Sequence, residues 1–160
     1  MNNYSNTYNQ GADEFLTKPL IITGEVRPRI DDGTYEAKFI HHKTSNFKQS
    51  PKVEFVFEIT KGIYLGNQLG LFLTVKEAAG PMGLNGAFIP KGHHSNLAKL
   101  LKASALMVNK GHASIADLRL ITWSIVVSET THGWDKSPLP EGSRYSKIVS
   151  ATPKQSISDF

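Results

Sequence analysis

Two polar stretches of the sequence, residues 41–48 and residues 132–147, combine basic side chains with aromatic rings. Cations pair with phosphates and rings stack on bases, and together these contacts bind a single strand of nucleic acid. Lys38, before the first stretch, and Tyr64 and Phe72, between the two stretches, have the same character. The candidate nucleic-acid contacts are Lys38, His42, Lys43, Phe47, Lys48, Tyr64, Phe72, Trp134, Lys136, Arg144, Tyr145 and Lys147.

Several of these candidates also have a purely structural interpretation, and the sequence leaves both open. Phe47 and Trp134 either stack on bases or fold back to anchor their loops. Phe72 faces away from its two leucine neighbours, so it is either a stacking platform or a contact with a second subunit in a homo-oligomer. Lys38 is either a phosphate contact or a solvated lysine on a strand.

The same residue types argue against an enzyme or a metal site. Six histidines are present, but the pairs 41–42 and 93–94 are adjacent in sequence, and adjacent strand residues point in opposite directions. With no cysteine, a zinc site is not expected. No glycine-rich phosphate loop or nucleophile elbow occurs, and a nuclease site built from Asp31, Asp32 and Glu36 lacks a supporting lysine motif. We expect no catalytic residue, metal or cofactor.

Composition places the chain among ordinary globular proteins with a modest basic excess. The 160 residues carry a net charge of +4, and 39% of them are hydrophobic. No apolar run approaches the roughly 20 residues that span a bilayer. The first ten residues do not resemble a secretory signal. We therefore expect no membrane contact and a cytoplasmic location, in a bacterial or phage-infected host cell.

Alternating apolar residues predict five strands around one helix. In residues 52–60, Val53, Phe55, Phe57 and Ile59 share the inward face, and in residues 117–128, Trp123 belongs to such a face. The other strands are predicted over 34–41, 63–75 and 144–152. Residues 95–107 predict a helix with Ser95 as N-cap and an apolar stripe of Leu97, Leu100, Leu101 and Leu106. Long connections are expected over 42–51 and 76–92.

Three strands, one helix and two strands form the element order of the OB fold, a partly open five-stranded barrel. We predict this fold, all-β apart from a helix between strands three and four, for residues 19–154. Residues 1–18 are expected to form a flexible N-terminal segment and residues 155–160 a C-terminal tail. OB folds grip oligonucleotides with the loops between strands one and two and between strands four and five. The two basic and aromatic stretches fall in these loops.

Short matches over residues 31–154 resemble a family of phage and mobile-element proteins that bind single-stranded DNA in replication or recombination. They are DGTYEAKF at 32–39, KVEFVFEIT at 52–60, YLGNQL at 64–69, NLAKLLKA at 96–103 and YSKIVSATP at 145–153. The apolar GLFLTV after the glycine step departs from the aromatic or charged character expected there. The resemblance implies an OB fold and single-stranded-DNA binding, with no catalytic residue.

Two functional hypotheses follow. The first is a sequence-tolerant single-stranded-DNA-binding protein serving replication or recombination of a phage or mobile element. The second is an OB-fold protein-interaction subunit that recruits a DNA-processing enzyme. The chain ends in Asp159 and Phe160 and so resembles the acidic, Phe-ended tips through which single-strand-binding proteins recruit replication or recombination enzymes. The alternative for these residues is a plain tail.

Overall fold

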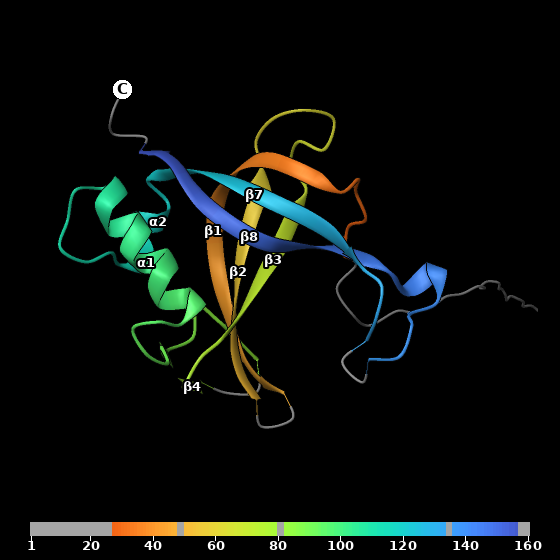
Figure 1. The fold of residues 1–160 in the computed structure, drawn as a ribbon, viewed down its shortest axis with the longest axis horizontal. Coiled ribbons are helices and arrows are strands. Elements are labelled where there is room, and N and C mark those ends of the chain that lie inside the picture. Colours follow the sequence, from red (N-terminus) through yellow and green to blue (C-terminus); the bar gives the residue numbers. More distant parts are fainter. Residues whose placement is uncertain (1–26, 48–49, 80–81, 134–135, 157–160) are drawn as a thin grey trace, which may run out of the picture.

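Five long strands form one antiparallel sheet in the order β3-β2-β1-β7-β8 (Figure 1). The structure, a computed structural model, describes residues 27–47, 50–79, 82–133 and 136–156. The strands are β1 (Gly33–Phe47), β2 (Ser50–Ile59), β3 (Gln68–Thr74), β7 (Ile121–Thr130) and β8 (Tyr145–Ser156). Short β5 (Met82–Leu84) pairs with β1, and β4 (Glu77–Ala78) pairs with β6 (Phe88–Ile89). The helices are α1 (Asn96–Met107), α2 (Ile115–Leu118) and the 3₁₀ turn η2 (Glu141–Ser143).

Strand β1 bends and so pairs with both halves of the sheet, with β2 in the half that contains β3 and with β7 in the half that contains β8. Its first residues, Gly33 to Lys38, pair with β7, while most of its length, from Ala37 to Phe47, pairs with β2. The register shifts between Phe39 and His41, which marks a β-bulge. A bulge bends and twists its strand, and Figure 1 shows β1 turning from β7 to run along β2. The two halves are therefore joined through one curved strand.

The predicted inward faces form the hydrophobic core. Val53, Phe55, Phe57 and Ile59 on β2 are fully buried, as are Ile121, Trp123 and Ile125 on β7. The Trp123 ring meets Phe57 edge to face, with centroids 5.3 Å apart, and its Nε1–H donates a hydrogen bond to the Leu118 carbonyl at 3.1 Å. The prediction that Trp123 is a core residue is confirmed.

Helix α1 begins where the sequence predicts it. The Ser95 hydroxyl accepts a hydrogen bond from the Ala98 N–H at 3.2 Å, and Leu97 and Leu100 are buried. Figure 1 shows α1 lying beside the far end of β8. Leu106, assigned to the apolar stripe, is 82% exposed. That assignment is wrong because nine residues after Leu97 make two and a half turns, which place Leu106 on the opposite side of the helix.

The bounds of several predicted strands and loops differ from those in the structure. Residues 42–47, predicted as part of a loop, complete β1, and β2 begins at Ser50. Residues 63–67, predicted as strand, form a turn that follows Gly62 and contains Gly66, both with positive φ. The predicted fourth strand starts at Ile121, because 115–118 form α2 with a capping box between Ser114 and Asp117. The 76–92 connection contains β4, β5 and β6.

The protein is thus mostly β, with one main helix between its third and fourth long strands, as predicted. Strands β3 and β8, at the two ends of the sheet, approach each other. Among the residues that the structure describes, they form no hydrogen-bonded pairing, so the sheet is not closed. The predicted flexible segment 1–18 and most of the 155–160 tail lie outside the described residues.

No helix in the described part of the chain is long and apolar enough to span a membrane.

Candidate nucleic-acid interface

A groove of about 690 Å³ lies on the outer face of strands β1, β2 and β3, opposite the core. Val56 belongs to this face because its neighbours Phe55 and Phe57 both point into the core. Val56 is nevertheless only 5% exposed, since it forms part of the groove floor. The groove is lined by Arg27, Pro28, His41, Lys43, Glu54, Val56, Gly66, Asn67, Gln68, Leu69, Gly70, Leu84 and Ser146.

Gly70 lines the groove and, because it has no side chain, leaves space at the groove floor. It pairs with Val56 across β2 and β3, and the next outward positions, Glu54 and Phe72, pair with each other. A Cβ at Gly70 would collide with the Glu54 carboxylate, so that carboxylate lies directly over the Gly70 backbone. Any other residue at position 70 would push the Glu54 side chain aside. This glycine therefore makes room for a charged side chain.

Cations line the same groove as this carboxylate. Lys43 on β1 is the cross-strand neighbour of Glu54, and His41 lies two positions earlier on the same strand. Arg27 contributes a guanidinium from the segment that precedes β1. The groove thus holds two permanent cations and one carboxylate, which leaves its charge positive. Such a surface attracts a polyanion.

Two aromatic rings stand at the opening between the ends of the sheet. Phe72 on β3 is 37% exposed, and Tyr145 begins β8. The Arg27 guanidinium carbon lies 5.3 Å from the Phe72 centroid and 4.8 Å from the Tyr145 centroid. A flat cation placed over two rings is a favourable cation–π arrangement. It also indicates that both rings offer a face to a planar group.

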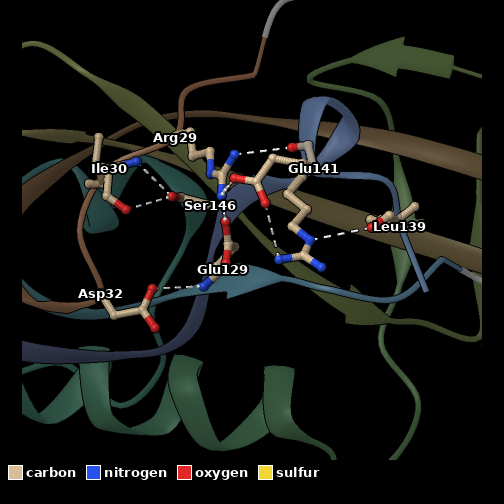
Figure 2. Close-up of polar contacts among 8 residues, drawn as sticks. Arg29, Ile30, Asp32, Glu129, Leu139, Glu141 and Ser146 are labelled. Carbon is tan, nitrogen blue, oxygen red and sulfur yellow. Dashed lines mark hydrogen bonds and ion pairs between the residues drawn. The ribbon is translucent and has the colours of Figure 1, made fainter.

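The segment before β1 is fixed to β7 and β8, which determines where Arg27 lies (Figure 2). The Ser146 hydroxyl accepts a hydrogen bond from the Ile30 N–H at 2.8 Å and donates one to the Ile30 carbonyl at 3.1 Å. The Ser146 N–H donates to the Pro28 carbonyl at 3.0 Å. The Glu129 N–H donates to the Asp32 carboxylate at 2.9 Å.

Arg29 adds an ionic contact to this attachment. Its guanidinium pairs with the Glu129 carboxylate and donates to the Glu141 carboxylate at 2.8 Å (Figure 2). The hydrogen bond from Arg29 lowers the pKa of Glu141 below its ordinary value. These residues support the neighbouring Arg27 and are engaged with each other, so we do not count them as nucleic-acid contacts.

Three predicted site residues have structural partners. Tyr64 packs against the core and meets Tyr35 edge to face, with centroids 5.9 Å apart. The Arg144 Nε–H donates to the Leu139 carbonyl at 3.3 Å, and its guanidinium lies 3.6 Å from the Glu141 carboxylate. Tyr64 and Arg144 therefore stabilise a turn and a loop, respectively. Lys38 lies 3.6 Å from the Glu58 carboxylate but stays half exposed.

His42 requires a correction. We expected it in an exposed loop, but it is 6% exposed on β1, between the rings of Phe55 and Phe88. Its Nε2 is 2.9 Å from the Gly86 carbonyl, to which it donates. A nucleic acid cannot reach this imidazole. The predicted contact at His42 is therefore wrong.

The remaining candidates divide between the surface and the part of the chain that is not described. Lys136 is exposed in the loop between β7 and β8, and Lys147 is half-buried on β8 opposite Ser128. Neither lines the groove. The candidates outside the described residues are the Phe47 side chain, Lys48, Trp134, Asp159 and Phe160.

The structure places Lys43 in the groove together with Arg27 and Glu54, which the sequence did not assign to the site. The rings of Phe72 and Tyr145 do not line the groove, but both lie under the Arg27 guanidinium. Arg27 lies outside the two basic and aromatic stretches of the sequence. Glu54 looked like an ordinary outward strand residue. In the described ranges, no cluster of three or more histidine and acidic side chains could hold a metal ion.

Comparison of the chain with protein-family models, curated protein sequences and solved structures finds no match.

Proposed function

We propose that this protein is an OB-type barrel that binds single-stranded DNA in the groove on the outer face of β1, β2 and β3. The observation that carries the proposal is the position of Arg27, which lines the groove together with Lys43 and lies over the rings of Phe72 and Tyr145 beside it. Cations along a groove and rings on which bases stack are the two parts of a sequence-tolerant single-strand site.

The strand order supports the OB assignment. A barrel of this type has its first strand between the second and the fourth, and its helix between the third and the fourth. The long strands here follow that order, since β1 lies between β2 and β7 and α1 lies between β3 and β7 in sequence. OB folds bind oligonucleotides on the face of strands two and three, and the groove lies on β2 and β3.

Stacking supports a single strand over a duplex. In a duplex both faces of each base are covered by neighbouring base pairs, so an aromatic side chain cannot stack without unstacking the helix. In the proposed complex a base takes the place of the Arg27 guanidinium on the Phe72 ring. Arg27 is then available to pair with a phosphate. The sequence resemblance adds the hypothesis that this binding serves replication or recombination of a phage or mobile element.

The direct test is fluorescence anisotropy with a labelled 12-nucleotide single strand, the matching duplex and an RNA of the same sequence. Each is titrated at two salt concentrations, because phosphate contacts make affinity depend on salt. We expect the single strand to bind more tightly than the duplex and its affinity to fall steeply with salt. Equal affinity for the duplex, or no response to salt, would contradict the proposal.

A protein-interaction role is the second candidate, and one observation favours it. Val126 and Val149, on the outer faces of β7 and β8, are 38% and 50% exposed. Exposed apolar side chains of this kind can contact another protein. Replacing both with serine should leave DNA affinity unchanged under the first proposal. It should abolish recruitment of a DNA-processing enzyme under the second.

A further inference from the structure

The Arg27 guanidinium covers the two rings beside the groove. Its central carbon lies 5.3 Å from the Phe72 centroid and 4.8 Å from the Tyr145 centroid. Phe72 belongs to β3 and Tyr145 to β8. In the described part of the chain these two strands approach each other without a hydrogen-bonded pairing. One side chain therefore covers a ring on each side of the opening in the sheet.

The backbone beside Arg27 is fixed, whereas its side chain is exposed. The carbonyl of the next residue, Pro28, accepts a hydrogen bond from the Ser146 N–H at 3.0 Å, and Ile30 is buried and bonded to the Ser146 hydroxyl. Arg27 itself is exposed and also lines the groove. An arginine side chain is long and has many rotamers. The guanidinium can therefore leave the rings and turn into the groove while the backbone stays in place.

The two ring contacts are comparable in strength to the contact that would replace them. A cation–π contact at an exposed site favours the contacting state by a factor of roughly 2 to 5, so two rings together favour it by about tenfold. A base stacked on an aromatic side chain contributes roughly 5- to 150-fold to affinity. A base can therefore displace the guanidinium, but its measured affinity is reduced by the fraction of molecules in which the rings are covered.

We propose that Arg27 is an intramolecular competitor of the base, which closes the Phe72 and Tyr145 rings in the free protein. The inference rests on the proposed single-strand binding and adds to it a closed free state that the strand must open. It also divides the contribution of Arg27 into two opposing effects. Removing the guanidinium uncovers the rings for a base, and it removes a cation that pairs with phosphate.

Two 12-mers of the same base sequence separate these effects, one with phosphodiester links and one with uncharged methylphosphonate links. Anisotropy titrations compare the wild type with Arg27→Ala. The matched control is Arg119→Ala, which also removes a guanidinium from above a ring. Arg119 lies 5.7 Å from the Phe39 centroid and does not line the groove. Thermal unfolding verifies that each variant is folded.

Arg27→Ala should bind the uncharged strand about tenfold more tightly than the wild type does, because no guanidinium has to leave the rings. With the phosphodiester strand, the same variant should reduce the slope of log affinity against log salt by roughly 0.7, the contribution of one phosphate contact. Arg119→Ala should bind the uncharged strand as the wild type does. An Arg27→Ala variant that binds the uncharged strand no more tightly than the wild type would overturn the proposal.

A measurement without nucleic acid separates this inference from the proposed function. Protons above an aromatic ring resonate upfield, so the Nε–H signal of Arg27 in the ¹⁵N-labelled wild type should lie upfield of its position in Phe72→Leu. The signal is assigned by its absence in Arg27→Ala. An equal position in both proteins would overturn the closed state, whether or not the strand binds.

Addition of the phosphodiester strand completes the test. Movement of the Arg27 signal away from its upfield position supports displacement by a base. A signal that stays upfield while the strand binds would overturn the competition and leave the single-strand site intact. No binding of either strand would contradict the proposed function and the competitor role together, although the closed ring pair would still stand on the signal of the free protein.

Discussion

The two halves of the sheet bury similar side chains on their inner face and differ on their outer face. On the inner face, β2 and β7 alike bury a row of large apolar residues, including Phe57 and Trp123. On the outer face, β1, β2 and β3 form a groove, whereas β7 and β8 expose Val126 and Val149. The alternation of buried residues therefore indicates the fold, whereas the function depends on which side chains are accessible on each outer face.

The largest effect we expect is in the common core. Trp123→Ala should lower the free energy of unfolding by about 3–5 kcal/mol, because it leaves a cavity beside Phe57. It also removes the hydrogen bond to the Leu118 carbonyl. Urea unfolding followed by circular dichroism measures the change. A loss below about 1 kcal/mol would mean that the two halves do not share one packed core.

The second prediction separates the outer face from the core. Phe72→Ala should weaken binding of a single strand by about 1–3 kcal/mol, the usual contribution of one stacked base. The thermal midpoint of the Phe72→Ala variant should differ little from that of the wild type, because Phe72 is partly exposed on the outer face. Phe72→Leu keeps an apolar side chain but removes the stacking ring, so it should lose most of the same affinity. Normal binding by Phe72→Ala would remove this ring from the site.

The third prediction concerns the β7 side of the molecule, where α2 leads into the strand. The Lys110 ammonium, at 2.7 Å, and the Ser114 N–H, at 2.8 Å, bond to the buried Asp117 carboxylate and lower its pKa to about 2. A lowered pKa in the folded state stabilises the protein above the ordinary carboxyl pKa, and this contribution is lost as the pH falls toward 2.

Asp117→Asn should therefore be less stable than the wild type at pH 6. The difference in urea midpoint should shrink as the pH is lowered from 4 to 2, while single-strand affinity at neutral pH stays the same. A difference that is independent of pH would show that the charge of Asp117 does not contribute. Reduced affinity at neutral pH would extend the site to α2.

The smallest expected effect is on the salt dependence of binding. Lys43→Gln should reduce the slope of log affinity against log salt by roughly 0.7 to 1, the contribution of one phosphate contact. Lys99→Gln, on the exposed side of α1 and outside the groove, is the matched control and should leave the slope unchanged. Equal changes in both variants would indicate that the charge of the whole surface, not the groove, attracts the strand.

The sequence predicts the core well because burial follows a simple alternation. Val53, Phe55 and Phe57 have this pattern and are all buried. The pattern failed in β1, where the bulge after Phe39 inverts the alternation, so that His42 points inward and His41 lines the groove. One extra residue in a strand reverses the face of every later side chain.

The sequence predicts the candidate site less completely than it predicts the core. Lys43, Phe72 and Tyr145 were predicted from their residue types. The position of Arg27, which lines the groove with Lys43 and lies over both rings, depends on contacts between distant parts of the chain. The Ile30–Ser146 hydrogen bond, which helps to hold that segment in place, joins residues 116 positions apart. The groove also depends on Gly70, whose local pattern indicates a bend but gives no sign that a carboxylate lies over it.

The most direct test maps the bound strand onto the two outer faces. Amide chemical shifts of the ¹⁵N-labelled protein are followed as a dC 12-mer is added. We predict that the largest changes occur at Val56 and Gly70 in the groove and at Phe72 beside it, with small changes at Val126 and Val149. Changes concentrated at Val126 and Val149, with the groove unaffected, would contradict single-strand binding in the groove.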